Sequence, residues 1–298
     1  MYRELILKQI LILTLLLLYS HAVPPLSKTE EAKREMIKSL NLDINGTSKD
    51  TITSIITSSF NLKSYKENYL LPFSYRYDSP HIDNGIHESK DVETEFQISI
   101  RYDIGSDFLG LGEIYSFGYT QRSWWQVYAD SAFFRESNYQ PELFVKIPTY
   151  KTFLKNSPIK GFKVAAIHQS NGRGGEYERS WNRLSLSTFM QHKNIIGELE
   201  MWYRLPDNID YNPELLDYLS YGKLKLMMPY HRHLFKLNLS ANPSTNKGSA
   251  EFTYSFPLPV REEDDLFLFF KTFNGYGESL IDYNQNVNKV SIGVSISR

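Results

Sequence analysis

The stretch Phe96-Gln-Ile-Ser-Ile-Arg-Tyr-Asp103 alternates apolar and polar side chains residue by residue. Successive side chains on a β-strand point to opposite faces, so this stretch predicts a strand with one apolar and one polar face. Similar runs occur near residues 69–77, 94–104, 113–126, 138–148, 160–170, 180–191, 194–205, 218–228, 232–241, 248–257, 264–274 and 288–297. The chain from residue 61 onward is therefore predicted to be all-β.

The number and length of these runs bear on two all-β architectures. In a soluble β-sandwich the apolar face packs against a second sheet, whereas in a transmembrane barrel it faces lipid and the polar face lines the lumen. About twelve runs of roughly ten residues give an even number of strands, each long enough to cross a bilayer when tilted. We expect residues 61–298 to form a twelve-stranded antiparallel transmembrane β-barrel, with the sandwich as the alternative.

The composition excludes several functional classes. The 298 residues include 33 Lys+Arg and 34 Asp+Glu, and the resulting net charge of −1 provides no basic surface for nucleic acid. The chain has no cysteine, which excludes disulfides, thiolate zinc sites and a cysteine nucleophile. A covalent mechanism would therefore require an oxygen nucleophile.

The first residues have the pattern of a secretory signal. Two basic residues precede an apolar run at 10–19, and small residues ending at Ala22 form a cleavage-site pattern. The apolar run is about half as long as the roughly 20 residues that a transmembrane helix needs. We expect residues 1–22 to be a cleaved signal peptide and the polar residues 23–60 to form an N-terminal arm.

Candidate catalytic residues lie in the segment 166–184. His168 and Ser170 are two positions apart, so on a strand their side chains share one face. The glycine cluster that follows would turn the chain, and the resulting hairpin would return Asn182 beside His168. An imidazole activates a serine hydroxyl when a third group orients the ring, and the oxygen of Asn182 could do so.

The parity of these strands predicts where the group lies. His168 shares its face with Val164, and Asn182 shares its face with Leu184, so the candidate triad would lie on the outer, lipid-facing wall. The N–H of Gly172 could serve as an oxyanion donor. The alternative is that the His and Ser are ordinary surface residues and that the glycines only form a turn.

Two further groups have both a structural and a functional interpretation. The tryptophan pair at 124–125 falls at a strand end, which is typical of an interfacial aromatic girdle. Asp130 and Ser131, together with Glu176 and Glu178, offer hard oxygen ligands suited to calcium. The alternative is that these loop side chains are simply solvated.

Several longer motifs follow one another along residues 68–298. They are Tyr119-Thr-Gln121, Ser123-Trp-Trp-Gln126, Arg135-Glu-Ser-Asn-Tyr-Gln-Pro141, His168-Gln-Ser-Asn-Gly-Arg173, Arg179-Ser-Trp-Asn-Arg183 and Gly275-Tyr-Gly-Glu-Ser-Leu-Ile-Asp-Tyr-Asn284. In this order they resemble the bacterial outer-membrane phospholipase A family, and the interval from His168 to Asn182 matches without a gap.

The resemblance implies an enzyme of the bacterial outer membrane, with its active site toward the outer leaflet. It implies calcium-dependent hydrolysis of the acyl ester bonds of phospholipids and lysophospholipids, activated by homodimerisation. Carried over to this chain, Ser170 would be the nucleophile, His168 the general base and Asn182 the orienting partner.

The resemblance also implies an oxyanion donor and Ca²⁺ as the cofactor. Gly172 would donate its N–H, and calcium would be held by the carbonyl of Arg173, by residue 178 and, across the dimer, by the hydroxyl of Ser131. Gln121 matches the polar residue of the dimer interface. Position 178 is Glu where the relatives have a hydroxyl residue, so we expect tighter calcium binding here, because affinity rises with ligand charge.

Two rival hypotheses belong to other classes of protein. A non-catalytic porin or structural barrel would conduct solutes through its polar lumen, with His168 and Ser170 incidental to its function. A secreted soluble esterase with a β-sandwich fold would need no detergent for extraction. Channel conductance that survives Ser170→Ala would favour the porin.

Overall fold

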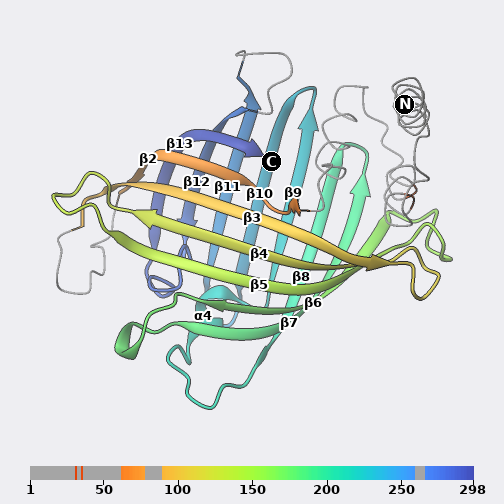
Figure 1. The fold of residues 1–298 in the computed structure, drawn as a ribbon, viewed down its shortest axis with the longest axis horizontal. Coiled ribbons are helices and arrows are strands. Elements are labelled where there is room, and N and C mark those ends of the chain that lie inside the picture. The colour runs from red at the N-terminus through yellow and green to blue at the C-terminus, as the bar shows by residue number, and fades with distance from the viewer. Residues whose placement is uncertain (1–30, 32–34, 36–61, 78–88, 259–265) are drawn as a thin grey trace, which may run out of the picture.

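The computed structural model describes residues 31, 35, 62–77, 89–258 and 266–298 (Figure 1). The predicted signal peptide at 1–22 lies outside the described residues. The predicted arm at 23–60 also lies outside them, apart from Glu31 and Glu35.

Antiparallel strands make up most of the described chain (Figure 1). Their bounds are β1 Leu62–Ser64, β2 Asn68–Arg76, β3 Val92–Ser106, β4 Ile114–Trp125, β5 Phe134–Pro148, β6 Ile159–Ser170, β7 Ser180–His192, β8 Ile195–Leu205, β9 Gly222–Tyr230, β10 His233–Asn242, β11 Lys247–Pro257, β12 Phe267–Gly275 and β13 Val287–Ser297. The loops contain a 3-10 turn, η1 (Gly175–Tyr177), and a short helix, α4 (Leu215–Leu219).

Twelve of the described strands close into a barrel. Each of β2 to β12 pairs antiparallel with the next strand along the chain, and β13 pairs with β2. The short β1 pairs with β3 beyond the end of β2. Closure pairs the outermost strands and so removes the free edges that an open sheet would expose. The predicted twelve-stranded antiparallel barrel is confirmed, and the sandwich is not formed.

One predicted strand begins later than its sequence pattern indicates. In the run at 218–228, the first residues belong to α4, which ends at Leu219. Ser220 follows with a positive φ of 69°, and β9 begins at Gly222. Leu215 of this helix is fully buried in an apolar cluster with Trp181. Within the described residues, no helix is long and apolar enough to span a membrane.

The alternation places apolar side chains outside the barrel and polar side chains inside. On β7, Leu184 and Leu186 are 48% and 50% exposed, whereas the intervening Arg183 and Ser185 are buried. Other exposed apolar side chains on the strands include Ile98, Tyr102, Ile104, Phe117, Leu143, Val164, Leu199, Met201, Tyr203, Met228 and Ile292. An apolar outer surface around a polar interior is the arrangement that a bilayer requires.

Trp124 and Trp125 lie on opposite faces of β4, which corrects the interpretation of both as girdle residues. Trp124 is fully buried inside the barrel, where its Nε1 donates to Glu278 at 2.8 Å. Trp125 stacks on the half-exposed ring of Phe134, with centroids 5.4 Å apart. Consecutive strand residues point in opposite directions, so only Trp125 can take part in an outer girdle.

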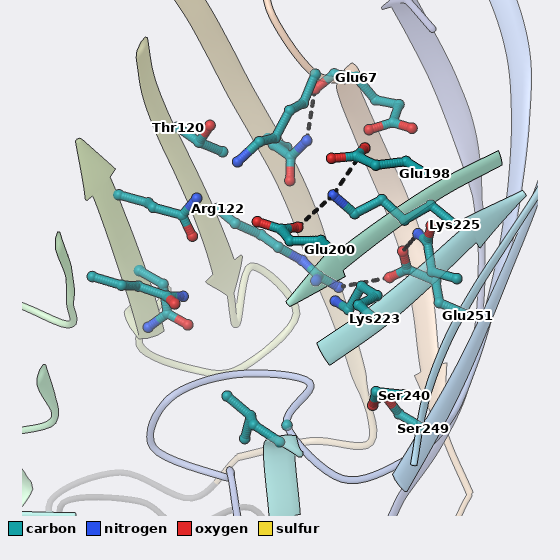
Figure 2. Close-up of a pocket in the computed structure, with 18 of the residues that line it drawn as sticks. Glu67, Thr120, Arg122, Glu198, Glu200, Lys223, Lys225, Ser240, Ser249 and Glu251 are labelled. Atoms are coloured by element: carbon teal, nitrogen blue, oxygen red, sulfur yellow. Dashed lines mark hydrogen bonds and ion pairs between the residues drawn. The ribbon is translucent and has the colours of Figure 1, made fainter. Parts of the chain in front are cut away.

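Charged side chains line the lumen and pair across it. Figure 2 shows Lys225 of β9 beside Glu198 and Glu200 of β8, at 3.2 and 2.7 Å. Arg122 of β4 reaches Glu251 of β11, a strand that is not its neighbour, at 3.7 Å. These side chains line a cavity of about 470 Å³. Ion pairs that span the interior do not favour the open channel that a porin requires.

The segment 276–286, between β12 and β13, packs into the end of the barrel that carries the β6–β7 loop. Asp282 is fully buried and pairs with Arg76 at 3.1 Å and with Arg135. Arg135 also pairs with Glu93 of β3, with Nε and Oε2 2.8 Å apart. Buried charges therefore join this segment directly to β2 and β5, and through Arg135 to β3.

A second carboxylate of this segment, Glu278, joins the same network. Its Oε1 lies 2.6 Å from Nζ of Lys289. Burial alone would raise the pKa of Glu278, but the charges of Lys289, Arg76 and Arg135 outweigh burial and lower this pKa to about 2. The carboxylate is therefore ionised and matched by cations.

Arg135→Met tests the contribution of this network to stability. The variant leaves Glu93 and Asp282 buried without their shared cation, so we expect the free energy of unfolding to fall by about 3–5 kcal/mol. Urea unfolding in detergent micelles would measure the change. The control is Lys151→Met, whose 3.2 Å ion pair with Asp107 is 40% and 31% exposed, and we expect it to cost at most about 1 kcal/mol. Equal losses in the two variants would contradict the prediction.

Candidate active site

The β6–β7 hairpin brings His168 and Asn182 into contact, as the spacing of the sequence predicts. The two residues are direct cross-strand partners, and His168 Nδ1 lies 2.8 Å from Asn182 Oδ1. The other end of the same amide, Nδ2, donates to Asp207 Oδ1 at 2.8 Å. The sequence pattern does not indicate Asp207, because it lies in the loop after β8 rather than in the hairpin.

The His168 side chain lies on the outer face of the barrel, near its rim. It is exposed, as is Val164 on the same face of β6. Ser170 is half-buried and follows His168 by two positions at the end of β6, so its side chain lies on the same face. Leu184 extends this face on β7. The imidazole and the hydroxyl therefore share a wall with the apolar outer surface.

Asn171, to which the sequence pattern assigns no role, organises the loop after Ser170. Its side chain is buried, and Oδ1 accepts from the N–H groups of Arg173 at 3.3 Å and of Arg179 at 3.0 Å. Its Nδ2 donates to the carbonyl of Tyr177 at 2.9 Å. An asparagine placed between a strand and a glycine is a turn signal, and this signal could have identified it.

Two features of position 172 favour glycine over other residues. Its φ of +66° lies in the left-handed region, which glycine enters without steric cost. A Cβ at this position would also lie 3.1 Å from Cε2 of Tyr139 on β5. The backbone N–H of Gly172 thus lies in the turn that directly follows Ser170, two positions along the chain.

The two calcium candidates on this loop present oxygen atoms of different kinds. The guanidinium of Arg173 is directed to β5, where it donates to the carbonyl of Arg135 and lies 3.3 Å from Glu136 Oε2. Glu178 is half-buried, and Arg179 donates to its main-chain carbonyl at 2.7 Å. The loop therefore offers a carbonyl and a carboxylate, both hard oxygen ligands that suit calcium.

The remaining candidates lie on other elements. Ser131 is exposed in the loop between β4 and β5, at the same end of the barrel as the β6–β7 loop. Gln121 lies on the outer face of β4, where its amide accepts from Tyr119 and donates to Ser123, both at 3.2 Å. In the part of the chain that the structure describes, no three or more His, Asp or Glu side chains gather as a metal site.

Comparisons with known proteins agree with this fold. A family model described as Phospholipase A1 matches residues 49–296. The Phospholipase A1 of Escherichia coli K12 is 35% identical over 211 residues, which cover 69% of this chain and 70% of the relative.

Two solved structures are similar to the whole barrel. One is outer membrane phospholipase A of Escherichia coli in an active-site mutant with alanine in place of an asparagine, with a TM-score of 0.72, 30% identity and coverage of 80% of this chain and 92% of that chain. The other is a Salmonella typhi outer membrane phospholipase dimer with bound calcium, with a TM-score of 0.73, 30% identity and coverage of 81% and 95%. These matches confirm the predicted family: the chain belongs to the phospholipase A1 family of bacterial outer-membrane phospholipases.

Proposed function

We propose that this outer-membrane protein hydrolyses the acyl ester bonds of phospholipids and lysophospholipids through Ser170, His168 and Asn182. The observation that carries the proposal is the 2.8 Å contact between His168 Nδ1 and Asn182 Oδ1 on the lipid-facing wall. The active-site mutation of the Escherichia coli relative, an asparagine replaced by alanine, supports a role for an asparagine.

The contact with Asn182 prepares His168 to act as a base. An amide oxygen only accepts hydrogen bonds, so Nδ1 of the ring must carry a proton. A neutral imidazole then has its lone pair on Nε2. In the proposed mechanism this nitrogen takes the proton of Ser170, whose side chain lies on the same face of β6.

The reaction would proceed through an acyl-enzyme. Ser170 Oγ bonds to the ester carbonyl carbon while its proton passes to His168 Nε2, and the Gly172 N–H donates to the oxyanion. The tetrahedral intermediate collapses as the ester C–O bond breaks, and the leaving oxygen takes the proton from His168. Water then attacks the acyl-enzyme with His168 again as the base, which releases the fatty acid and restores Ser170.

The position of these residues on the outer wall determines how the substrate approaches. A lipid in the bilayer can bring its ester to Ser170 without entering the lumen, because Val164 and Leu184 extend the apolar surface below it. We place the active site toward the outer leaflet, at the barrel end that carries the β6–β7 loop and the longer β8–β9 and β12–β13 segments, residues 206–221 and 276–286.

The oxygen donors of the β6–β7 loop fit a calcium ion. The carbonyl of Arg173 and the carboxylate of Glu178 would hold it, with the hydroxyl of Ser131 from a second copy of the chain. When bound, calcium would supply positive charge that stabilises the oxyanion. The dimer of the Salmonella typhi relative with bound calcium supports this proposal.

Homodimerisation would then control activity, since a monomer would lack one of the calcium ligands. Gln121 is the polar residue that the family resemblance assigns to the dimer interface, and its amide lies on the outer face of β4, where a second copy within the membrane could contact it. We also propose that residues 1–22 are a cleaved export signal and that residues 23–60 form an arm before the barrel.

Ser170→Ala should abolish lipid hydrolysis, because it removes the nucleophile. We expect fatty-acid release from phospholipid–detergent micelles with calcium to fall by at least about a thousandfold. The control is Ser185→Ala on β7, whose buried side chain faces the lumen and which should retain full activity. Hydrolysis that survives Ser170→Ala would refute the proposed nucleophile, and conductance without hydrolysis in the unmutated protein would favour the porin.

Glu178→Ser should weaken calcium binding, because it replaces a charged ligand with a neutral hydroxyl. We expect the calcium concentration for half-maximal activity to rise by about tenfold, measured by titration after EDTA treatment. Glu176→Ser is the matched control, since it removes an exposed carboxylate from the same loop and should leave the calcium requirement unchanged. A Glu178→Ser variant that needs no more calcium would contradict the assignment.

Activity per subunit should rise with the fraction of dimer. We expect specific activity in micelles to increase as the protein-to-detergent ratio increases, and chemical cross-linking to preserve it on dilution. Gln121→Ala should shift this rise to higher protein concentration. Equal activity in dilute monomer and cross-linked dimer would rule out control by dimerisation.

A further inference from the structure

The amide of Asn182 lies between an imidazole and a carboxylate. Its Oδ1 is 2.8 Å from His168 Nδ1, and its Nδ2 donates to Asp207 Oδ1 at 2.8 Å. The series of side chains Ser170, His168 and Asn182 thus continues to an acidic residue, Asp207, in the loop between β8 and β9. Asp207 takes no direct part in the mechanism described above.

The backbone brings Asp207 to this position through the register of β8. Leu205, the last residue of β8, is the cross-strand partner of Asn182, so Asp207 follows it by two residues at the same rim. The loop that follows is held by contacts that do not involve Asp207. Arg204 pairs with Asp210 at 2.6 Å and donates to the carbonyl of Asn212 at 3.0 Å.

Asn212 connects this loop to the start of β7. It is fully buried, and its Oδ1 accepts from the N–H of Ser180 at 3.2 Å. Its own N–H donates to Asp210 Oδ1 at 3.0 Å. Removing the Asp207 carboxylate therefore leaves these anchors of the loop in place.

An asparagine has an ambiguity that an aspartate in the same role would lack. Its amide can turn either the oxygen or the NH₂ group toward the imidazole. If the NH₂ group faced His168 Nδ1, that nitrogen would have to accept, and the ring proton would lie on Nε2. The ring could not then take a proton from Ser170.

We propose that Asp207 is a positioning residue that holds the Asn182 amide in the productive orientation. An ionised carboxylate only accepts hydrogen bonds, so it draws the NH₂ group of Asn182 toward itself and leaves Oδ1 for His168. The carboxylate also places a negative charge two hydrogen bonds away from the ring that becomes an imidazolium. This inference rests on the proposed function of Ser170 and His168.

The arrangement has a physical advantage on a lipid-facing wall. A carboxylate against His168 would lie beside the apolar outer surface, where an ion is costly to desolvate. Asp207 is half-buried in the polar loop at the rim, next to exposed residues such as Asn208. The neutral amide thus connects the imidazole to a charge that stays near water.

A set of variants at 182 and 207 tests the proposal in the full-length protein extracted in detergent. The readout is the second-order rate of Ser170 labelling by a fluorophosphonate, which measures activation of the nucleophile without turnover. We expect Asp207→Ala to slow labelling and to lower kcat by about tenfold with little change in KM. Asn208→Ala, a neighbouring exposed amide, should leave both unchanged.

The exchange of the two residues distinguishes positioning from a purely structural role. Asn182→Asp alone places two carboxylates side by side, so Ser170 labelling should be slow. Adding Asp207→Asn to this variant restores a hydrogen-bond donor between the two side chains, and the labelling rate should recover by about tenfold. Asp207→Asn would then harm the native background and help the Asn182→Asp background. If the Asp207 carboxylate had only a structural role, Asp207→Asn would slow labelling in both backgrounds.

The outcomes separate this inference from the proposed function. If the unmutated protein labels no faster than Ser170→Ala, the proposed function itself fails. If the unmutated protein labels rapidly and Asp207→Ala labels within about twofold of it, only the positioning role is overturned. Failure of Asp207→Asn to rescue Asn182→Asp, in a variant with an unchanged unfolding midpoint, also overturns the positioning role.

Discussion

A backbone that crosses a bilayer has no water to satisfy its hydrogen bonds, so the ladder of strands must close on itself. In this protein β13 pairs with β2, and β2 to β13 are paired in sequence around the barrel. Closure forces every strand to present one face to lipid and one to the lumen. The apolar outer surface and the charged interior both follow from this constraint.

The polar interior requires that charged side chains be buried in the lumen. A narrow barrel that turns its apolar side chains outward must bury its charges, and buried charges need partners. Arg135 meets Glu93 and Asp282, while Arg122 meets Glu251 across the lumen. The pairs of Arg135 with Glu93 and of Arg122 with Glu251 join strands that are not neighbours. Pairs made by Asp282 and Glu278 hold the segment 276–286 at the end of the barrel. The lumen stabilises the wall, and the candidate chemistry lies on the opposite face of that wall.

The site reflects the same division between lipid and water. His168 lies among apolar side chains on the outer wall, and a neutral amide is its immediate partner. The charged groups lie farther out, in the loops at the rim, where Asp207 contacts Asn182 and Glu178 is within the β6–β7 loop. The proposed site thus keeps ionised groups near water, and it places the imidazole and the serine on the wall that faces lipid.

Local pattern determined much of this protein. The period of two predicts the strands and their faces, and a short hairpin sets the register that joins His168 to Asn182, because both depend on nearby residues alone. The later start of β9 depends on packing at the rim, and the partner of Trp124 in the lumen, Glu278, comes from a segment distant in sequence. Only the closed barrel determined which charges meet inside it and which loop residue reaches Asn182. Those contacts join strands that are distant in sequence, and their geometry is fixed by strand tilt and closure, which no local spacing encodes.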